Sequence, residues 1–205
     1  MIEKLFNEPK LLGIVADINS GKSNTIYHII EMLRKNAEFS LYTYGLKFPT
    51  GTQIFSLEEL EIITDSIIII DEAMTLFKLS NAKNKETIEN TLRLLFHNNN
   101  IILLSILPEN GKKFIVSKFN AVIFKKTTIA DCINGSVLKR IVTQYCGPEK
   151  GSTILNLPID KALIFNGKSY SMLDVEYYPE FDSKSANKPI LRRKQSKNIF
   201  KRKVI

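Results

Sequence analysis

The sequence has few cysteines and histidines, and no apolar run long enough to cross a membrane. Its 205 residues include two Cys and two His, with no CxxC spacing, so neither a disulfide scaffold nor a Cys/His zinc site is expected. The longest uncharged apolar runs, at residues 66–70 and 101–107, are far shorter than the roughly 20 residues of a membrane helix. The first ten residues are too charged for a signal peptide. These absences predict a reduced, cytoplasmic protein without a transmembrane segment.

Positive charge is concentrated at the C-terminus. The net charge is +8, but residues 183–205 hold nine Lys or Arg and no acidic residue, which leaves about −1 for residues 1–182. With 44% apolar and 24% charged residues, we expect one globular domain over residues 1–182 and a disordered basic tail over 183–205. Three roles remain open for the tail: a solvated segment, a contact with the phosphate backbone of DNA, or docking on a capsid or an anionic membrane.

Short apolar runs alternate with helical periodicity along the chain. Strands are predicted at residues 11–16, 39–44, 52–55, 66–70, 101–107 and 121–125. Helices are predicted after residue 21, after a Ser56–Glu59 capping box, and at 84–97, 111–119 and 130–145. Residues 161–175 form two apolar runs around Asn166-Gly167, which predicts a β-hairpin. The alternation predicts an α/β fold with a mostly parallel sheet, flanking helices and a C-terminal hairpin.

A phosphate-binding loop is predicted between the first strand and the first helix. Residues 16–23 (ADINSGKS) fit the pattern GxxxxGK[ST], except that Ala16 replaces the first glycine. In such loops the backbone amides and the helix N-terminus surround a phosphate, the lysine reaches its outer oxygens and the hydroxyl residue ligates Mg²⁺. We therefore expect ATP and Mg²⁺ as ligands, with Ser23 on the metal. The residues expected to hold the nucleotide are Ala16, Asp17, Ile18, Asn19, Ser20, Gly21, Lys22, Ser23 and Asn24.

A second stretch, residues 162–169 (ALIFNGKS), matches the same relaxed pattern. Its Lys168 and Ser169 follow a hairpin turn and run into a strand, so no helix is expected to present amides there. The structural context therefore favours Lys22 and Ser23 over Lys168 and Ser169.

Two carboxylates follow the buried run at residues 66–70. In enzymes with a phosphate loop, an Asp such as Asp71 at this place holds Mg²⁺, and an adjacent Glu such as Glu72 takes a proton from the attacking water. The alternative is that both acids only begin a helix after the strand.

These motifs resemble the FtsK/HerA superfamily of DNA-pumping ATPases, and within it the small genome-packaging ATPases of tailless, membrane-containing viruses. The resemblance covers roughly residues 11–175, including the loop, the strand ending in Asp-Glu-Ala, and FHNNNIILLSILPE at 96–109. It implies a RecA-like (ASCE) P-loop fold in which the strand at 101–107 lies between those of the two motifs, with Ser105 near the phosphates. Phe96 stands at the family's Arg and Leu107 at its polar Gln sensor, and these departures with Ala16 put hydrolysis in doubt.

The resemblance also implies a homo-oligomeric ring in which an arginine of one subunit acts on the nucleotide of its neighbour. Residues 1–182 contain three arginines, Arg34, Arg93 and Arg140. Arg140 is the preferred catalytic candidate because its helix follows the strand at 121–125, which is expected to be an outer one.

The leading functional hypothesis is an ATP-hydrolysing motor that translocates double-stranded DNA, as in viral genome packaging. The alternative is a slow or non-hydrolysing nucleotide-dependent assembly factor related to zonula occludens toxin. A small-molecule kinase is disfavoured, because three arginines are few for a site that binds several phosphates.

Overall fold

The computed structural model describes residues 5–8, 10–71, 73, 85–108, 113–127 and 153–179. The strands are β1 (Lys10–Val15), β2 (Ser40–Tyr44), β3 (Thr52–Gln53), β4 (Ser66–Ile70), β5 (Ile101–Ile106), β6 (Ala121–Phe124), β7 (Lys161–Phe165) and β8 (Tyr170–Asp174). The helices are α1 (Lys22–Arg34), α2 (Leu57–Leu60), α4 (Lys85–His97) and α5 (Lys113–Val116). The helix expected at 130–145 and the basic tail lie outside the described residues.

All eight described strands form one sheet in the order β3-β2-β4-β5-β1-β6-β7-β8. The pairs from β3 to β6 are parallel, whereas β6–β7 and β7–β8 are antiparallel. The predicted α/β class, the mostly parallel sheet and the C-terminal hairpin are therefore confirmed. Strand β5 lies between β1 and β4, as the resemblance implied.

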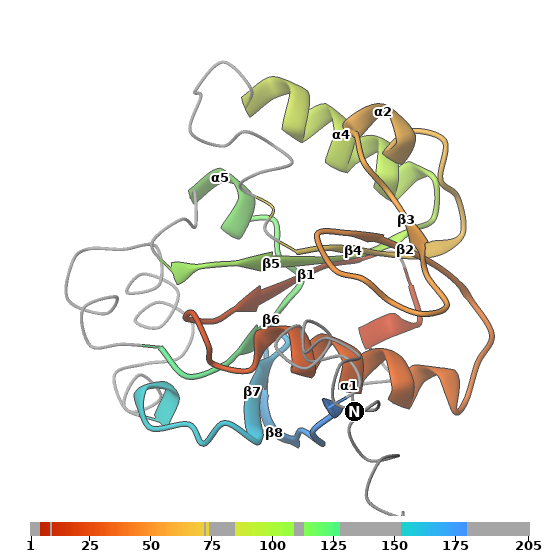
Figure 1. Cartoon of the computed structure of the whole chain (residues 1–205). Helices are drawn as coiled ribbons and strands as arrows, with labels where there is room; N and C mark the ends of the chain where they lie inside the picture. Colours follow the sequence, from red (N-terminus) through yellow and green to blue (C-terminus); the bar gives the residue numbers. More distant parts are fainter. Residues whose placement is uncertain are drawn as a thin grey trace, which may run out of the picture.

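Helices cover both faces of the sheet (Figure 1). Helix α1 packs on one face through Ile26, Ile29 and Ile30, which are fully buried. Helices α2, α4 and α5 pack on the other face. Each buried isoleucine stabilises the fold by about 1.5–3 kcal/mol. Strand β4 is buried at all five positions because helices cover it on both sides, which explains its uninterrupted run of isoleucines. No helix among the described residues is long and apolar enough to cross a membrane.

The short helix α2 begins close to the predicted capping box. The Ser56 hydroxyl accepts the backbone N–H of Glu59 at 3.4 Å, and the Glu59 carboxylate accepts the N–H of Phe55 at 3.3 Å, one residue earlier than in a standard box.

Parallel strands bring their carboxyl ends to one edge of the sheet. Strand β1 leads there into the loop at 16–21, β4 into Asp71, β5 ends with Ser105 and Ile106, and β6 leads into Lys125. His97 ends α4 and precedes the start of β5, which places it and Phe96 at the opposite edge. Phe96, which stands where the resembled family has an arginine, therefore lies far from the phosphate loop of its own chain.

Sequence reasoning made β6 an outer strand, and this was wrong. Strand β6 pairs with β1 on one side and with β7 on the other, because the C-terminal hairpin extends the sheet beyond it. The position of β6 therefore does not place the helix after it, which carries Arg140 in the sequence prediction, at the edge of the sheet.

Candidate functional site

The loop between β1 and α1 has the form of an anion-binding turn. The backbone N–H and the hydroxyl of Ser20 both donate to the carbonyl oxygen of Asp17, at 3.3 and 2.7 Å. Gly21 then adopts a left-handed conformation (φ 83°), and α1 begins at Lys22 with no side chain capping its first amides. These uncapped amides and the positive end of the helix dipole attract an anion.

Alanine is accommodated at the first loop position without strain. Ala16 is fully buried in the core under α1, and its N–H donates to the carbonyl of Ile106 at 3.3 Å. Its φ is not positive: within the described residues only Asn19, Asp65 and Asn99 are non-glycine residues with positive φ. The missing glycine therefore does not prevent the loop from adopting its turn.

Lys22, Asp71 and Ser105 form one polar cluster at the carboxyl edge of the sheet. The Lys22 ammonium lies 3.1 Å from Asp71 Oδ1, and the Ser105 hydroxyl donates to the same oxygen. Both partners of the ion pair are largely buried, with side chains 15% and 9% exposed, and Ser105 is fully buried. The three residues come from α1, the end of β4 and β5, so the sheet topology alone brings them together.

Asp71 is held in place by the end of β2. Its backbone N–H donates to the carbonyl of Tyr44 at 2.8 Å, which extends the β2–β4 pairing by one residue. The residue after Tyr44, Gly45, has a φ of 75°, and a Cβ there would lie 2.6 Å from the carbonyl oxygen of Asp71. Only glycine fits at this close approach.

Substitution of Gly45 with alanine is therefore expected to displace the end of β4. We expect the free energy of unfolding to fall by about 2–4 kcal/mol, because a positive φ and a backbone clash add. Gly167→Ala is the matched control, since Gly167 has a φ of 86° but nothing within 4 Å of its Cβ position, and a loss of only about 1 kcal/mol is expected. Urea denaturation of both variants measures the difference. Equal losses would mean that the approach to Asp71 is not constrained.

Tyr27 borders this cluster and was missed by sequence reasoning. It is buried on α1, and its hydroxyl donates to the carbonyl of Lys47 at 2.9 Å. Burial, aided by the negative charge of Asp71, raises the pKa of Tyr27 to about 12. The phenol therefore stays protonated and ties α1 to the loop after β2. Its position amid the apolar face of α1 gave no sign of this role.

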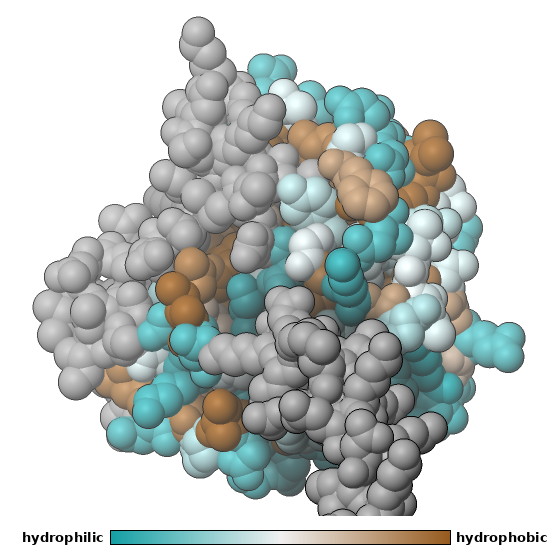
Figure 2. Space-filling model, viewed as in Figure 1, coloured by the Kyte–Doolittle hydropathy of each residue, from teal (hydrophilic) through white to brown (hydrophobic). Residues whose placement is uncertain are grey.

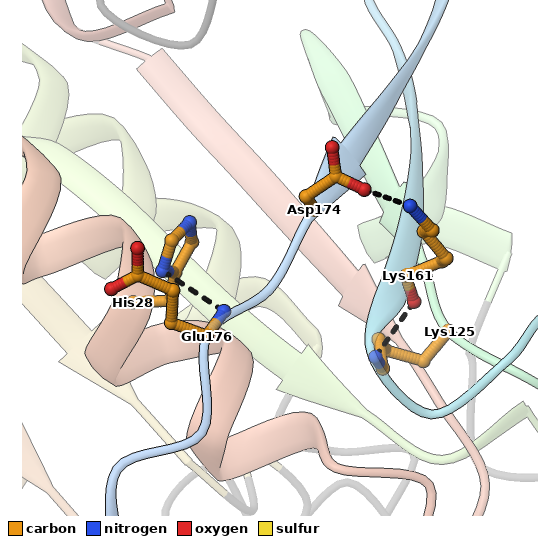
Figure 3. Close-up of polar contacts among 5 residues, drawn as sticks. All are labelled: His28, Lys125, Lys161, Asp174 and Glu176. Carbon is orange, nitrogen blue, oxygen red and sulfur yellow. Dashed lines mark hydrogen bonds and ion pairs between the residues drawn. The ribbon is translucent and has the colours of Figure 1, made fainter.

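A second residue missed by sequence reasoning is Lys125, at the end of β6. Its side chain is fully buried, and its ammonium donates to the carbonyl oxygens of Ile159 and Lys161 at 2.6 and 2.7 Å (Figure 3 shows the latter). Its Cε lies 3.7 Å from the position of a Cβ on Gly21. Burial lowers the pKa of Lys125 to about 8, against the opposing attraction of Asp160. The only signal in the sequence was its place directly after the apolar run of β6.

Asn24, expected to contact the nucleotide, uses its side chain elsewhere. Its amide donates to the carbonyl of Glu176 at 2.6 Å, and its oxygen accepts the N–H of Tyr178 at 2.8 Å. His28, one turn along α1, accepts the N–H of Glu176 through Nδ1 at 3.3 Å (Figure 3). Burial is the main reason that the pKa of His28 is lowered. These hydrogen bonds hold the segment after β8 against the first turns of α1.

The second motif match forms a hairpin turn rather than an anion site. Asn166 Oδ1 accepts the backbone amides of Lys168 and Ser169 at 3.0 and 2.9 Å, so both amides are already occupied. Strands β7 and β8 pair directly on either side of this turn. Residues 166–169 therefore form the β-hairpin turn that Asn166-Gly167 predicted.

The structure describes two of the three candidate arginines and does not describe Glu72, the residue predicted to act as the base. Glu72 and Arg140 lie outside the described residues. Arg34 pairs with Glu31 at 3.3 Å and lies 4.8 Å above the ring of Phe48, so it is engaged within its own chain. Arg93 is exposed on α4. Leu107 directly follows β5 and is half-buried.

The donor set at the loop fits Mg²⁺. This ion prefers oxygen ligands and is usually bound by one or two carboxylates together with water and substrate phosphates. The carboxylate of Asp71 and the hydroxyl of Ser23 at the start of α1 supply such oxygens. No group of three or more His, Cys, Asp or Glu side chains forms a metal cage in the part of the chain that the structure describes. The site therefore suits a metal that arrives with a phosphate ligand.

Solved structures with the same fold include viral genome-packaging NTPases. No protein-family model matches the sequence, and no curated protein does so either. The genome packaging NTPase B204 from Sulfolobus turreted icosahedral virus 2, in complex with sulfate, superposes with a TM-score of 0.64 at 17% identity, covering 84% of this chain and 98% of that one. B204 from Sulfolobus turreted icosahedral virus, described as a DNA-packaging ATPase, gives 0.61 at 15% identity, covering 83% and 99%.

A more distant similarity is to the conjugation coupling protein TcpA of pCW3, solved with ATPγS. Its TM-score is 0.53 at 14% identity, covering 84% of this chain and 61% of that one. At these identities the likeness establishes the fold alone, an α/β fold shared with these P-loop NTPases. The P-loop NTPase fold implied by the motif resemblance is therefore confirmed.

Proposed function

We propose that the protein is an ATP-hydrolysing motor that translocates double-stranded DNA, most specifically a viral genome-packaging ATPase. The observation that carries the proposal is the meeting of Lys22, Asp71 and Ser105 beside an uncapped helix N-terminus. The length of the structural match gives further support, because the shared fold covers nearly the whole length of the B204 packaging NTPases.

Each residue of the site has a defined task in this proposal. The amides of residues 17–23 and the Lys22 ammonium bind the β- and γ-phosphates of ATP. Ser23 and Asp71 would hold Mg²⁺, which when bound neutralises the charge that develops on the phosphates. Glu72 accepts the proton of the attacking water, and Ser105 orients Asp71 through its hydrogen bond.

Lys22 changes partner when ATP binds. Its ammonium pairs with Asp71 at 3.1 Å in a largely buried setting. A triphosphate on the loop competes for the same ammonium and releases the Asp71 carboxylate from its cation. The ion pair thus keeps the two charges compensated between turnovers, because an unpaired buried charge costs several kcal/mol.

Leu107 predicts slow hydrolysis. It follows β5, where the family's Gln senses the γ-phosphate, and a leucine side chain has no hydrogen-bonding atom. Slow turnover is also expected of the alternative, a nucleotide-dependent assembly factor, so the rate alone does not distinguish it from the motor. DNA dependence separates the two.

The remaining features of the motor are its ring, its arginine and its tail. We propose a homo-oligomeric ring in which Arg140 of one subunit stabilises charge on the nucleotide of the next, with Arg93 as the comparison residue. The nine positive charges in residues 183–205 bind DNA phosphates without regard to sequence.

The test measures ATP turnover with and without double-stranded DNA, and DNA affinity at two salt concentrations. DNA is expected to raise the rate. Removal of residues 183–205 is expected to weaken DNA binding and to reduce the slope of log affinity against log salt by about 0.9 for each phosphate that the tail neutralises. Basal turnover without DNA should be the same in both chains. A rate that DNA leaves unchanged would contradict the motor and favour the assembly factor.

A further inference from the structure

A large apolar side chain is exposed directly beside the phosphate loop. Ile159 is 68% exposed, and its Cγ1 lies 3.4 Å from the position of a Cβ on Gly21. Leaving such a side chain in water forgoes the stabilisation that burial brings. In Figure 2, apolar side chains lie among hydrophilic ones at the lower left, the region that the loop before α1 and the chain leading into β7 occupy in Figure 1.

The backbone of Ile159 is held in this position by a buried cation. The carbonyl oxygen of Ile159 accepts the Lys125 ammonium at 2.6 Å and lies 3.5 Å from the same Cβ position on Gly21. The carbonyl of the adjacent Asp160 accepts the N–H of Val175 at 2.8 Å, which ties the turn to the end of β8. Burial of the Lys125 ammonium costs free energy, and its hydrogen bonds to two backbone carbonyls offset part of that cost while they fix the turn.

The sheet order places Ile159 on the side of the loop away from Asp71 and Ser105. Strands β5 and β4, which position Ser105 and Asp71, lie to one side of β1. Strands β6 and β7, which position Lys125 and Ile159, lie to the other. Ile159 therefore lies on the side of the loop that is left for the opposite end, the base, of a nucleotide whose terminal phosphate meets Asp71.

We propose that Ile159 is the apolar platform for the base of the bound nucleotide, and that Lys125 is the positioning residue that fixes this platform against Gly21. The ligand class is a planar aromatic base linked to a triphosphate. The proposal rests on nucleotide binding at residues 17–23, as proposed above, and adds the site for the base.

The experiment compares two ligands that share phosphates and differ in the base. Calorimetry measures the affinity of the full chain for Mg·ATP and for Mg·tripolyphosphate. Ile159→Ala is expected to weaken ATP binding about five- to tenfold, because the base loses its apolar neighbour, and to leave tripolyphosphate binding unchanged. Met172→Ala is the matched control, because Met172 is a half-exposed apolar side chain on β8, and it should change neither affinity.

Lys125→Met tests the positioning role. It should reduce ATP affinity selectively, and Ile159→Ala added to it should cause no further loss, because both changes remove the same platform. Circular dichroism and thermal melting check the fold of the Lys125 variant. If it unfolds, Ile159→Ala still decides the proposal, because truncating an exposed side chain leaves the core intact.

The other outcomes are distinct. Equal loss of ATP and tripolyphosphate binding in Ile159→Ala would overturn the platform, because Ile159 would then act on the phosphate loop. Unchanged ATP affinity would overturn it as well. If the unaltered chain binds neither ligand, the proposed nucleotide site itself is wrong, a result that the variants do not produce.

Discussion

Replacement of Lys22 with alanine is expected to reduce ATP affinity by about 100-fold or more and to abolish turnover. Charge-assisted hydrogen bonds contribute up to about 3 kcal/mol each, and the Lys22 ammonium lies at the end of the loop beside Asp71. The ammonium also compensates the charge of Asp71. The measurements are calorimetric affinity for Mg·ATP and phosphate release.

Lys168→Ala is the matched control for this substitution. Lys168 occupies the same place in the second motif match but lies exposed on the β7–β8 turn, where Asn166 already accepts its amide. We expect its ATP affinity and turnover to equal those of the unaltered chain. If Lys168→Ala abolishes binding while Lys22→Ala preserves it, the nucleotide binds at the other loop. Thermal unfolding of both variants excludes loss of the fold as the cause.

The parts of the site that could be predicted are those that a local pattern specifies. Residues 16–23 and Asp71 each follow a recognisable apolar strand, and parallel strands end at one edge of the sheet. Periodicity did not specify which strands are neighbours. The order β4-β5-β1 followed from the family resemblance, which also placed Ser105 near the phosphates. The hydrogen bond from Ser105 to Asp71 is visible only in the structure.

The parts that could not be predicted depend on contacts between distant segments. Lys125 is one of two lysines after β6, and its burial arises from a turn that begins more than 30 residues later. Gly45 ends β2 as many glycines end strands, and its necessity appears only where Asp71 approaches it. The position of β6 was misjudged for the same reason, because the antiparallel hairpin that covers its free side follows the long segment 128–152.

Replacement of Glu72 with glutamine is expected to abolish turnover while preserving ATP affinity. Glu72 directly follows Asp71, whose backbone is fixed by the hydrogen bond from its N–H to Tyr44 and by the close approach of Gly45. Glutamine keeps the size of the side chain but cannot accept a proton from water, and a positioned base contributes about 10²- to 10⁴-fold in rate. We therefore expect kcat to fall by about that factor, with the calorimetric Kd for Mg·ATP unchanged within about twofold.

The same exchange at an exposed acid provides the control for Glu72. Glu61→Gln removes one negative charge at an exposed position after α2, so it reproduces the change in net charge without touching the site. Its turnover should match that of the unaltered chain. Equal loss of affinity and turnover in Glu72→Gln would make Glu72 a structural residue at the end of β4. Turnover that Glu72→Gln leaves unchanged would remove Glu72 as the base. If the unaltered chain already turns over so slowly that Glu72→Gln lowers the rate no further, the result favours the slow or non-hydrolysing assembly factor, because Leu107 after β5 cannot sense the γ-phosphate either.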